Sequence, residues 1–192
     1  MRRAARLVVA ANLAYFAVEI LVATRIGSVA LFADSMDFLE DAATNLLVLM
    51  ALGWSARRRA AVGAALAAVL LAPGVATLWT AWHRLGAGGV PAPLPLSLAG
   101  AGALLVNLGC ALLLARWREV GGSMVRAAFL SARNDVLANV AIIASGLVTA
   151  WLRSPWPDLA VGLGILALNM GAAREVWLAA REERRAADRG GP

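Results

Sequence analysis

Apolar runs separated by short polar links divide the 192-residue chain into six predicted spans. Each run is close to the ~20 residues that an α-helix needs to cross a bilayer. We expect helices at about residues 7–24, 28–53, 60–82, 94–115, 126–152 and 156–178. The pattern predicts an all-α membrane protein, a six-transmembrane-helix bundle over residues 1–182, followed by a short charged tail at residues 183–192 that we expect to be disordered.

The composition supports this class of protein. Hydrophobic residues make up 61% of the chain and charged residues only 16%, which is outside the range of soluble domains. The basic, apolar start resembles a signal peptide, but Glu19 interrupts it and five further spans follow, so we predict a retained first helix. The one cysteine, Cys110, lies in an apolar run, which excludes a disulfide framework within one chain.

The basic residues, all of them arginine, gather at the ends of the predicted spans. Of the 18 arginines, 14 lie at ends that share one side, 3 lie on the other side, and Arg133 lies inside the fifth span. By the positive-inside rule both termini are cytoplasmic. The net charge of +6 therefore reflects membrane topology and does not indicate a nucleic-acid partner.

The second span carries acids on one face. Asp34, Asp37 and Asp41 are spaced i, i+3 and i+7, within an arc of about 60° on a helix, and Asn45 continues the stripe. A charged carboxylate near the bilayer centre costs on the order of 2.5 to 3.5 kcal/mol, so these groups must face other helices, water or a cation. In a poorly hydrated site they need protons or a divalent metal to balance their charge.

Other predicted spans also contain polar groups at mid-depth, which indicates a shared polar interior. They are Asn12 and Glu19 in the first span, Asn107 in the fourth, Ser131, Asn134, Asp135 and Asn139 in the fifth, and Asn169 in the sixth. Asp37, Asp41 and Asp135 together give a net negative site whose oxygen donors suit divalent cations. Arg133 is about 200° around the helix from Asp135, so we expect it to pair with Glu19 or Asp34 instead.

The run IGSVALFADSMDFLEDA, in which Asp37 and Asp41 are four residues apart, resembles the second-helix signature of the cation diffusion facilitator family. Further segments are similar to family segments in the same order: LLVN in the fourth span, RAAFLSARNDVLANVAII in the fifth and WPDLAVGLGILAL in the sixth. The resemblance covers about residues 12–178. It implies a six-helix exporter of zinc and related divalent cations, usually in exchange for protons.

Two departures from the family pattern change the expectation. Ser131 stands where the family's fifth helix usually has histidine, which leaves an all-oxygen set of Asp37, Asp41 and Asp135 with Ser131 or Asn134. Such a set holds zinc less well and makes manganese or iron(II) more acceptable. The chain also resembles the family's shorter members, which lack the cytoplasmic domain used for dimer contacts, so a homodimer is left open.

The resemblance implies a secondary transporter in the bacterial cytoplasmic (inner) membrane, with no permanent cofactor. Its partners are the transported cation (Zn, Mn or Fe(II)), protons and lipid, and its site lies between the second and fifth helices. Supporting or proton-linked roles fall to Glu19, Asp34, Arg133 and Asn134. The alternative is a degenerate or accessory member without transport, which the missing histidine motivates. An intramembrane lipid-headgroup transferase is disfavoured, because the FLED turn after Asp37 lacks the glycine and arginine of that pattern, so we do not expect an enzyme.

Overall fold

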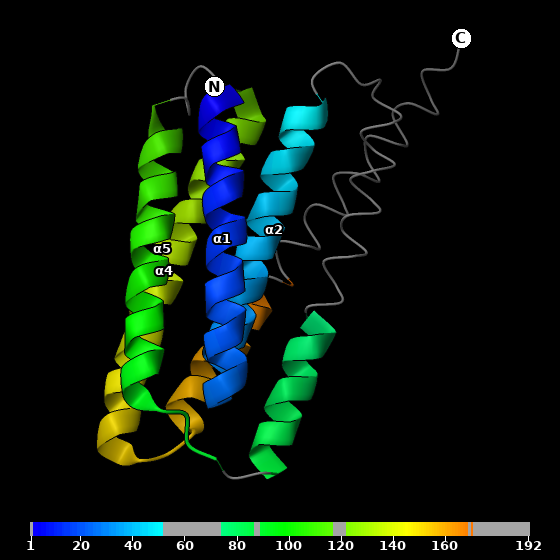
Figure 1. Ribbon diagram of the computed structural model, residues 1–192. Helices are drawn as coiled ribbons and strands as arrows, with labels where there is room; N and C mark the ends of the chain where they lie inside the picture. Colours follow the sequence, from blue (N-terminus) through cyan, green and yellow to red (C-terminus); the bar gives the residue numbers. More distant parts are fainter. Residues whose placement is uncertain (1, 52–73, 87–88, 117–121, 169, 171–192) are drawn as a thin grey trace.

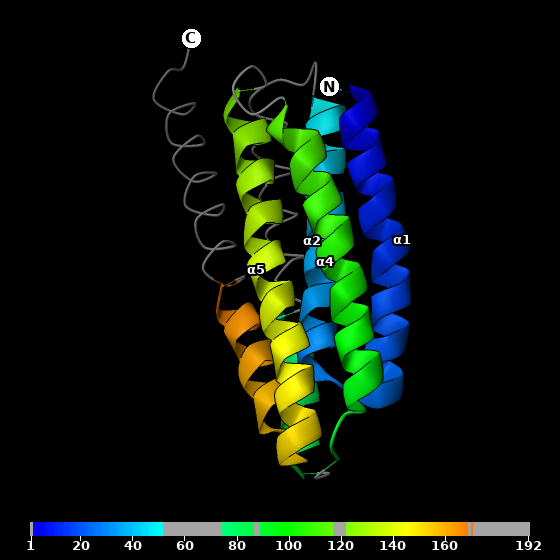
Figure 2. The same ribbon diagram turned by 90° about the vertical axis from the view of Figure 1, so that its left-hand side faces the viewer.

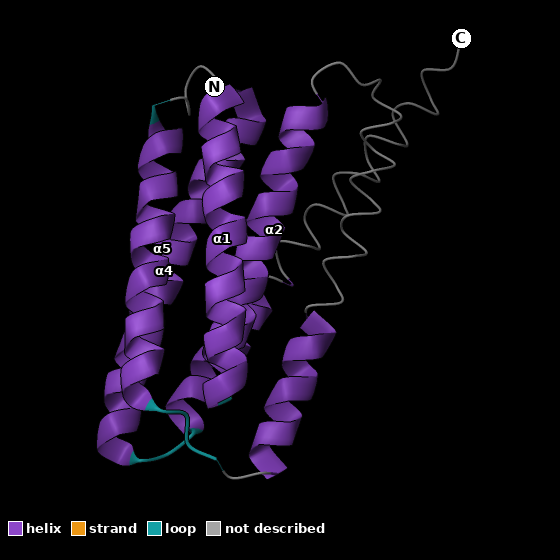
Figure 3. Cartoon of the chain, viewed as in Figure 1, coloured by secondary structure: helices purple, strands orange, loops and turns teal. Residues whose placement is uncertain are grey.

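The computed structural model describes residues 2–51, 74–86, 89–116, 122–168 and 170, and its regular structure in these residues is helical (Figure 3). A helix occurs in each of the six predicted spans. They are α1 (Arg2–Ile26), α2 (Val29–Ala51), residues 74–86, α4 (Pro93–Ala115), α5 (Gly122–Leu152) and Trp156–Leu168. The predicted helical membrane bundle is confirmed, and three of these helices, over Arg3–Ile26, Pro93–Ala115 and Ala132–Leu152, are long and apolar enough to cross a bilayer.

Several helix ends differ from the prediction. α1 begins at Arg2 and α5 at Gly122, four or five residues before the apolar runs, and residues 83–86 are still helical where a loop was expected. Hydrophobicity marks the part of a helix inside the hydrocarbon, whereas backbone hydrogen bonds continue into the headgroup region. Several parts of the predicted spans lie outside the described residues: 52–53, 60–73, 169, which is the position of the candidate Asn169, and 171–178. The predicted tail at 183–192 also lies outside them.

Successive helices run in opposite directions through the bundle (Figures 1 and 2). The short links after α1 and α5 contain residues with positive φ: Gly27, between α1 and α2, has φ 66°, and Arg153, after α5, has φ 50°. α4 packs most extensively against α5, and α1 against α2, while further contacts join α1 to α4 and α2 to α5. The four helices therefore enclose a common interior.

Small residues allow α4 and α5 to approach closely. A Cβ atom added to Gly146 would lie 2.2 Å from Ser97 Oγ and 3.3 Å from the Pro93 carbonyl oxygen. A Cβ added to Gly100 would lie 2.9 Å from Ile142 Cγ2. Such contacts supply the van der Waals packing that holds helices together in lipid, where the hydrophobic effect between them is absent.

The buried apolar residues form two main clusters at different heights in the bundle. The Leu96 cluster consists of Ala23, Ala30, Leu31, Ala33, Leu96, Ala99, Ile142 and Ile165. The Leu114 cluster consists of Val8, Cys110, Ala111, Leu114 and Ala132. Buried polar residues separate the two clusters in sequence on three helices: Asn12 and Glu19 on α1, Asn107 on α4 and Asn139 on α5. A polar layer therefore lies at mid-depth.

Large apolar side chains cover the outside of the bundle instead. Leu98, Leu105, Leu112, Leu137 and Leu147 are all exposed, on α4 and α5. This is the reverse of a soluble protein and fits a surface that faces lipid tails.

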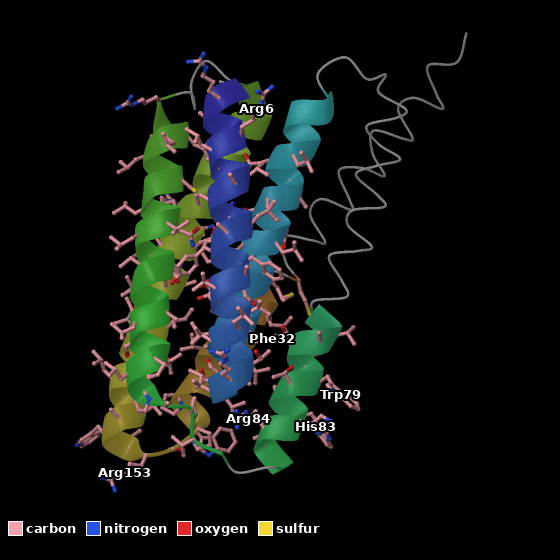
Figure 4. The ribbon with its side chains drawn as sticks, viewed as in Figure 1. Arg6, Phe32, Trp79, His83, Arg84 and Arg153 are labelled. Atoms are coloured by element: carbon pink, nitrogen blue, oxygen red, sulfur yellow. The ribbon has the colours of Figure 1, made fainter. Side chains whose placement is uncertain are left out.

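Arginines of the described residues lie at both ends of the bundle. Arg6 lies at the end where the chain starts, and Arg84 and Arg153 lie at the opposite end (Figure 4). This separation agrees with the two groups of arginines in the sequence. Which end faces the cytoplasm stays a prediction from the positive-inside rule.

We predict that Gly146→Leu destabilises the bundle, because the added side chain overfills the α4–α5 contact. Overpacking of this kind costs about 1–3 kcal/mol. The melting temperature of the detergent-solubilised protein should fall by several degrees. Gly109→Leu on α4 is the matched control, because nothing lies within 4 Å of a Cβ at that position. Equal melting temperatures for the two variants would contradict the close contact.

Candidate functional site

α2 directs its three aspartates toward the middle of the bundle. Asp34 is completely buried, whereas Asp37 and Asp41 are partly exposed. Their i, i+3, i+7 spacing places them on one face of the helix, as the sequence predicts. The acid stripe therefore runs from a fully buried position at Asp34 to partly exposed positions at Asp37 and Asp41.

α5 brings a fourth acid to this stripe. The carboxyl group of Asp135 lies within hydrogen-bond reach of the carboxyl group of Asp41. Asp135 is also the strongest electrostatic neighbour of Asp37. Two carboxylates are both acceptors, so they approach this closely only with a proton or a cation to share. Acids of the predicted second and fifth spans thus meet at one place.

This meeting place is not a closed ligand set. Among the residues that the structure describes, no group of three or more His, Cys, Asp or Glu side chains lies close enough to hold a metal ion. Ser131 is in α5, one turn before Asp135, and its side chain lies outside the described part of the structure. The assignment of Asp37, Asp41, Asp135 and Ser131 as metal ligands therefore stays a prediction.

Two asparagines repeat one arrangement on the two helices. Asn45 Nδ2 donates to the Asp41 carbonyl oxygen at 2.9 Å, and Asn139 Nδ2 donates to the Asp135 carbonyl oxygen at 2.7 Å. Each amide is thereby held one turn beyond an aspartate of the site. Asn139 Oδ1 is buried without a hydrogen-bond partner among the described residues, so it is a further oxygen donor beside Asp135.

Glu19 of α1 faces Asp34 of α2 in the closed part of the interior. Both residues are 0% exposed, and none of their four carboxyl oxygens has a donor in the described parts of the chain. The two side chains are placed to hydrogen-bond each other, which requires a proton on one of them. We call Glu19, Asp34, Asp37, Asp41 and Asp135 the acidic layer.

Aromatic groups beside Glu19 and Asp34 do not supply a donor. The Tyr15 hydroxyl donates to the Ala99 carbonyl oxygen at 2.6 Å, and its ring packs on Phe38 with centroids 5.1 Å apart. Gly102 leaves the space that Tyr15 fills, because a Cβ there would lie 2.2 Å from the hydroxyl oxygen. The Tyr15 hydroxyl is therefore already committed to the α4 backbone.

Arg133 and Asn134 do not join the acidic layer. Both are exposed on α5. The prediction that Arg133 pairs with Glu19 or Asp34 is wrong, because every carboxyl oxygen of those two acids lacks a described partner. The Arg133 side chain points out of the bundle, where its charge is better solvated than beside Asp34.

An acid that the sequence analysis did not single out, Asp158, lies at the N-terminal end of α2. Asp158 is 2% exposed and accepts hydrogen bonds from Ser28 Oγ at 2.5 Å and from the Val29 N–H at 2.7 Å. Ser28 directly precedes α2, where serine is a preferred capping residue, and this was the available signal. Its acidic partner lies 130 positions away, beyond any local pattern.

Comparisons with known proteins show the family of the chain. Residues 5–181 match the family model of the cation efflux transmembrane domain. Zinc transporter ZitB of Yersinia pseudotuberculosis serotype I (strain IP32953) and zinc transporter ZitB of Yersinia pestis are each 29% identical to the chain over 168 residues. Each match covers 81% of this chain and 53% of the relative, so the chain spans about half the length of these curated relatives.

Helices with lipid-facing apolar surfaces around an acidic layer define an integral membrane protein. The chain belongs to the cation efflux family, the transport family that the sequence resemblance indicated. It is an integral protein of the bacterial inner membrane.

We predict that Asp34→Asn stabilises the protein, because the new amide places a donor beside Glu19 and removes one buried charge. Relieving an unsatisfied buried polar group is worth on the order of 1–3 kcal/mol. The melting temperature in detergent should rise by several degrees. Glu40→Gln is the control, since it removes a charge near the same acids without adding a donor beside Glu19. An Asp34→Asn protein that melts at or below the temperature of Glu40→Gln would contradict the unsatisfied pair.

Proposed function

We propose that the protein is a secondary transporter that exports a divalent metal cation from the cytoplasm. The cation binds between α2 and α5, where Asp37, Asp41 and Asp135 supply oxygen ligands, with Ser131 one turn before Asp135. The observation that carries the proposal is the close approach of the Asp41 and Asp135 carboxyl groups from two different helices. Two facing carboxylates at mid-depth in a membrane bundle are costly unless a cation or a proton occupies the space between them.

Family membership and the named relatives support zinc as the first substrate to test. The oxygen-only set supports manganese and iron(II) as competing substrates, because it lacks a borderline-soft imidazole. Asn139 Oδ1, buried beside Asp135 without a described partner, is available as an additional hard donor. On this proposal the metal is cargo, and the protein has no resident cofactor and no enzymatic step.

The acidic layer also supports exchange for protons. When the cation leaves, Asp41 and Asp135 remain side by side, and a shared proton removes their repulsion. Metal arriving from the cytoplasm then displaces that proton. Glu19 and Asp34 extend this chain of carboxyl groups away from the metal, so they are placed to hold or pass on a proton.

We predict that Asp41→Asn and Asp135→Asn each lower zinc uptake by reconstituted vesicles at least tenfold. The substitutions keep the shape of the side chain and remove one charged ligand. Uptake is measured with a zinc-sensitive dye inside the vesicles, and opposing proton movement with a trapped pH dye. Asn134→Ala is the matched control, because it lies next to Asp135 and is exposed.

Parental rates in the aspartate variants would contradict the site. Zinc uptake without opposing proton movement would contradict exchange alone and leave transport standing. A parental protein that moves zinc, manganese and iron(II) no faster than empty vesicles would favour the degenerate or accessory alternative.

We predict that Ser131→His raises the ratio of zinc to manganese uptake at least fivefold, because imidazole binds zinc better than a hydroxyl does. Competition between the two ions in the same vesicles measures the ratio. Ser131→Ala is the control that separates loss of the hydroxyl from gain of the imidazole. An unchanged ratio would contradict a position for residue 131 within reach of the cation.

A further inference from the structure

Three segments that are distant in sequence meet at the start of α2. They are the turn between α1 and α2, the end of the helix at residues 74–86, and the start of the Trp156–Leu168 helix. Val29, Ala81 and Leu159, one from each of α2 and the two shorter helices, form a buried apolar cluster there. Hydrogen bonds lie beside this cluster, so both apolar packing and polar contacts join the three segments.

Asp158 caps α2 from another helix. Its carboxylate accepts hydrogen bonds from Ser28 Oγ (2.5 Å), the Val29 N–H (2.7 Å) and the Ala30 N–H (3.3 Å). Ser28 Oγ in turn accepts a hydrogen bond from the Leu31 N–H at 3.0 Å. A negative charge at this position also interacts favourably with the positive end of the helix dipole.

The backbone of the Trp156–Leu168 helix also packs directly on α2. Gly162 is one turn after Asp158, and a Cβ atom there would lie 2.8 Å from the Ala30 nitrogen and 2.8 Å from the Val29 carbonyl carbon. Any side chain at position 162 would therefore push the two helices apart. This contact is independent of the hydrogen bonds and fixes the same two helices together.

Arg84, at the end of the helix at residues 74–86, contacts the turn between α1 and α2. Its Nη2 donates to the Ile26 carbonyl oxygen at 2.9 Å, and its guanidinium fills the space that a Cβ of Gly27 would occupy. Arg84 also lies close enough to Asp158 for their charges to attract. Figure 4 shows Arg84 beside the end of α1.

We propose that Asp158 is a positioning residue for transport, which fixes the rotation and depth of α2 and so the placement of Asp37 and Asp41. This inference rests on the proposed function. α2 rises 1.5 Å per residue, so Asp37 lies about 12 Å along the helix from Val29, and Asp158 acts on the metal site only through α2. The clamp formed by Asp158, Ser28 and Gly162 makes α2 and the sixth helix move as one unit.

The test compares two measurements on purified, full-length protein. Amide hydrogen exchange reports on peptides that cover the first turns of α2, and vesicle uptake gives the apparent KM for zinc. Asp158→Ala should speed exchange in those turns at least tenfold and raise KM at least fivefold. Ser154→Ala is the matched control, because Ser154 Oγ accepts from the Trp156 N–H at the start of the same helix and does not contact α2 in the described structure. Its KM should stay within twofold of the parental value.

Two further variants keep the proposal testable if Asp158→Ala does not fold. Asp158→Asn retains one acceptor oxygen and should raise KM by two- to fivefold. Gly162→Ala leaves the carboxylate intact, pushes the helices apart and should raise KM as well.

The outcomes separate the clamp from the proposed function. Unchanged exchange in Asp158→Ala overturns the clamp. Faster exchange with an unchanged KM shows a structural cap only and overturns the positioning role. A parental protein that transports no cation contradicts the proposed function and the positioning role with it, while the exchange measurement still decides whether the clamp exists.

Discussion

Repulsion between the carboxyl groups of the acidic layer is the constraint that the rest of the bundle must offset. Where α1, α2 and α5 meet at mid-depth, their side chains oppose association unless positive charge is present. The attraction between helices must therefore come from elsewhere. The Leu96 and Leu114 clusters supply it above and below the layer, and the glycine contacts between α4 and α5 supply it at the side.

The separation of apolar clusters from the acidic layer also explains which residue types occur at each depth of the bundle. Alanine is frequent in the two apolar clusters, and glycine lies at the α4–α5 contacts, because close backbone approach gives packing energy that lipid does not. Asparagines accompany the acids, and their amides are tied to the backbone of the same helices, so they add polarity without adding charge. Apolar packing therefore stabilises the interior at the Leu96 and Leu114 clusters. Between the clusters, association of the helices depends on a proton or a cation among the carboxyl groups.

Much of this arrangement could be predicted from the sequence, because it depends on periodicity within single helices. The six spans and the shared face of Asp34, Asp37 and Asp41 follow from apolar run length and from 3.6 residues per turn. The fate of Arg133 could not be predicted in this way. Helical geometry gave its angle relative to Asp135, but not which neighbour, if any, occupies that direction, and the structure leaves it exposed.

The contacts around Asp158 show the same limit more clearly. A serine before a helix predicts a cap, and the sequence contains an acid in the WPD segment, but their meeting depends on how helices 130 positions apart are packed. The helix ends were misjudged for a related reason, since hydrophobicity does not record where backbone hydrogen bonding stops. Contacts between helices that are distant in sequence could not be predicted from the periodicity of single helices.

The unequal exposure of the acidic layer has a consequence for what can travel where. Asp37, Asp41 and Asp135 are partly exposed, whereas Glu19 and Asp34 are fully buried. A divalent cation needs several oxygen ligands or water molecules around it, whereas a proton needs only one acceptor atom. On the proposed function, the partly exposed acids therefore receive the metal, and the buried pair of Glu19 and Asp34 receives only protons.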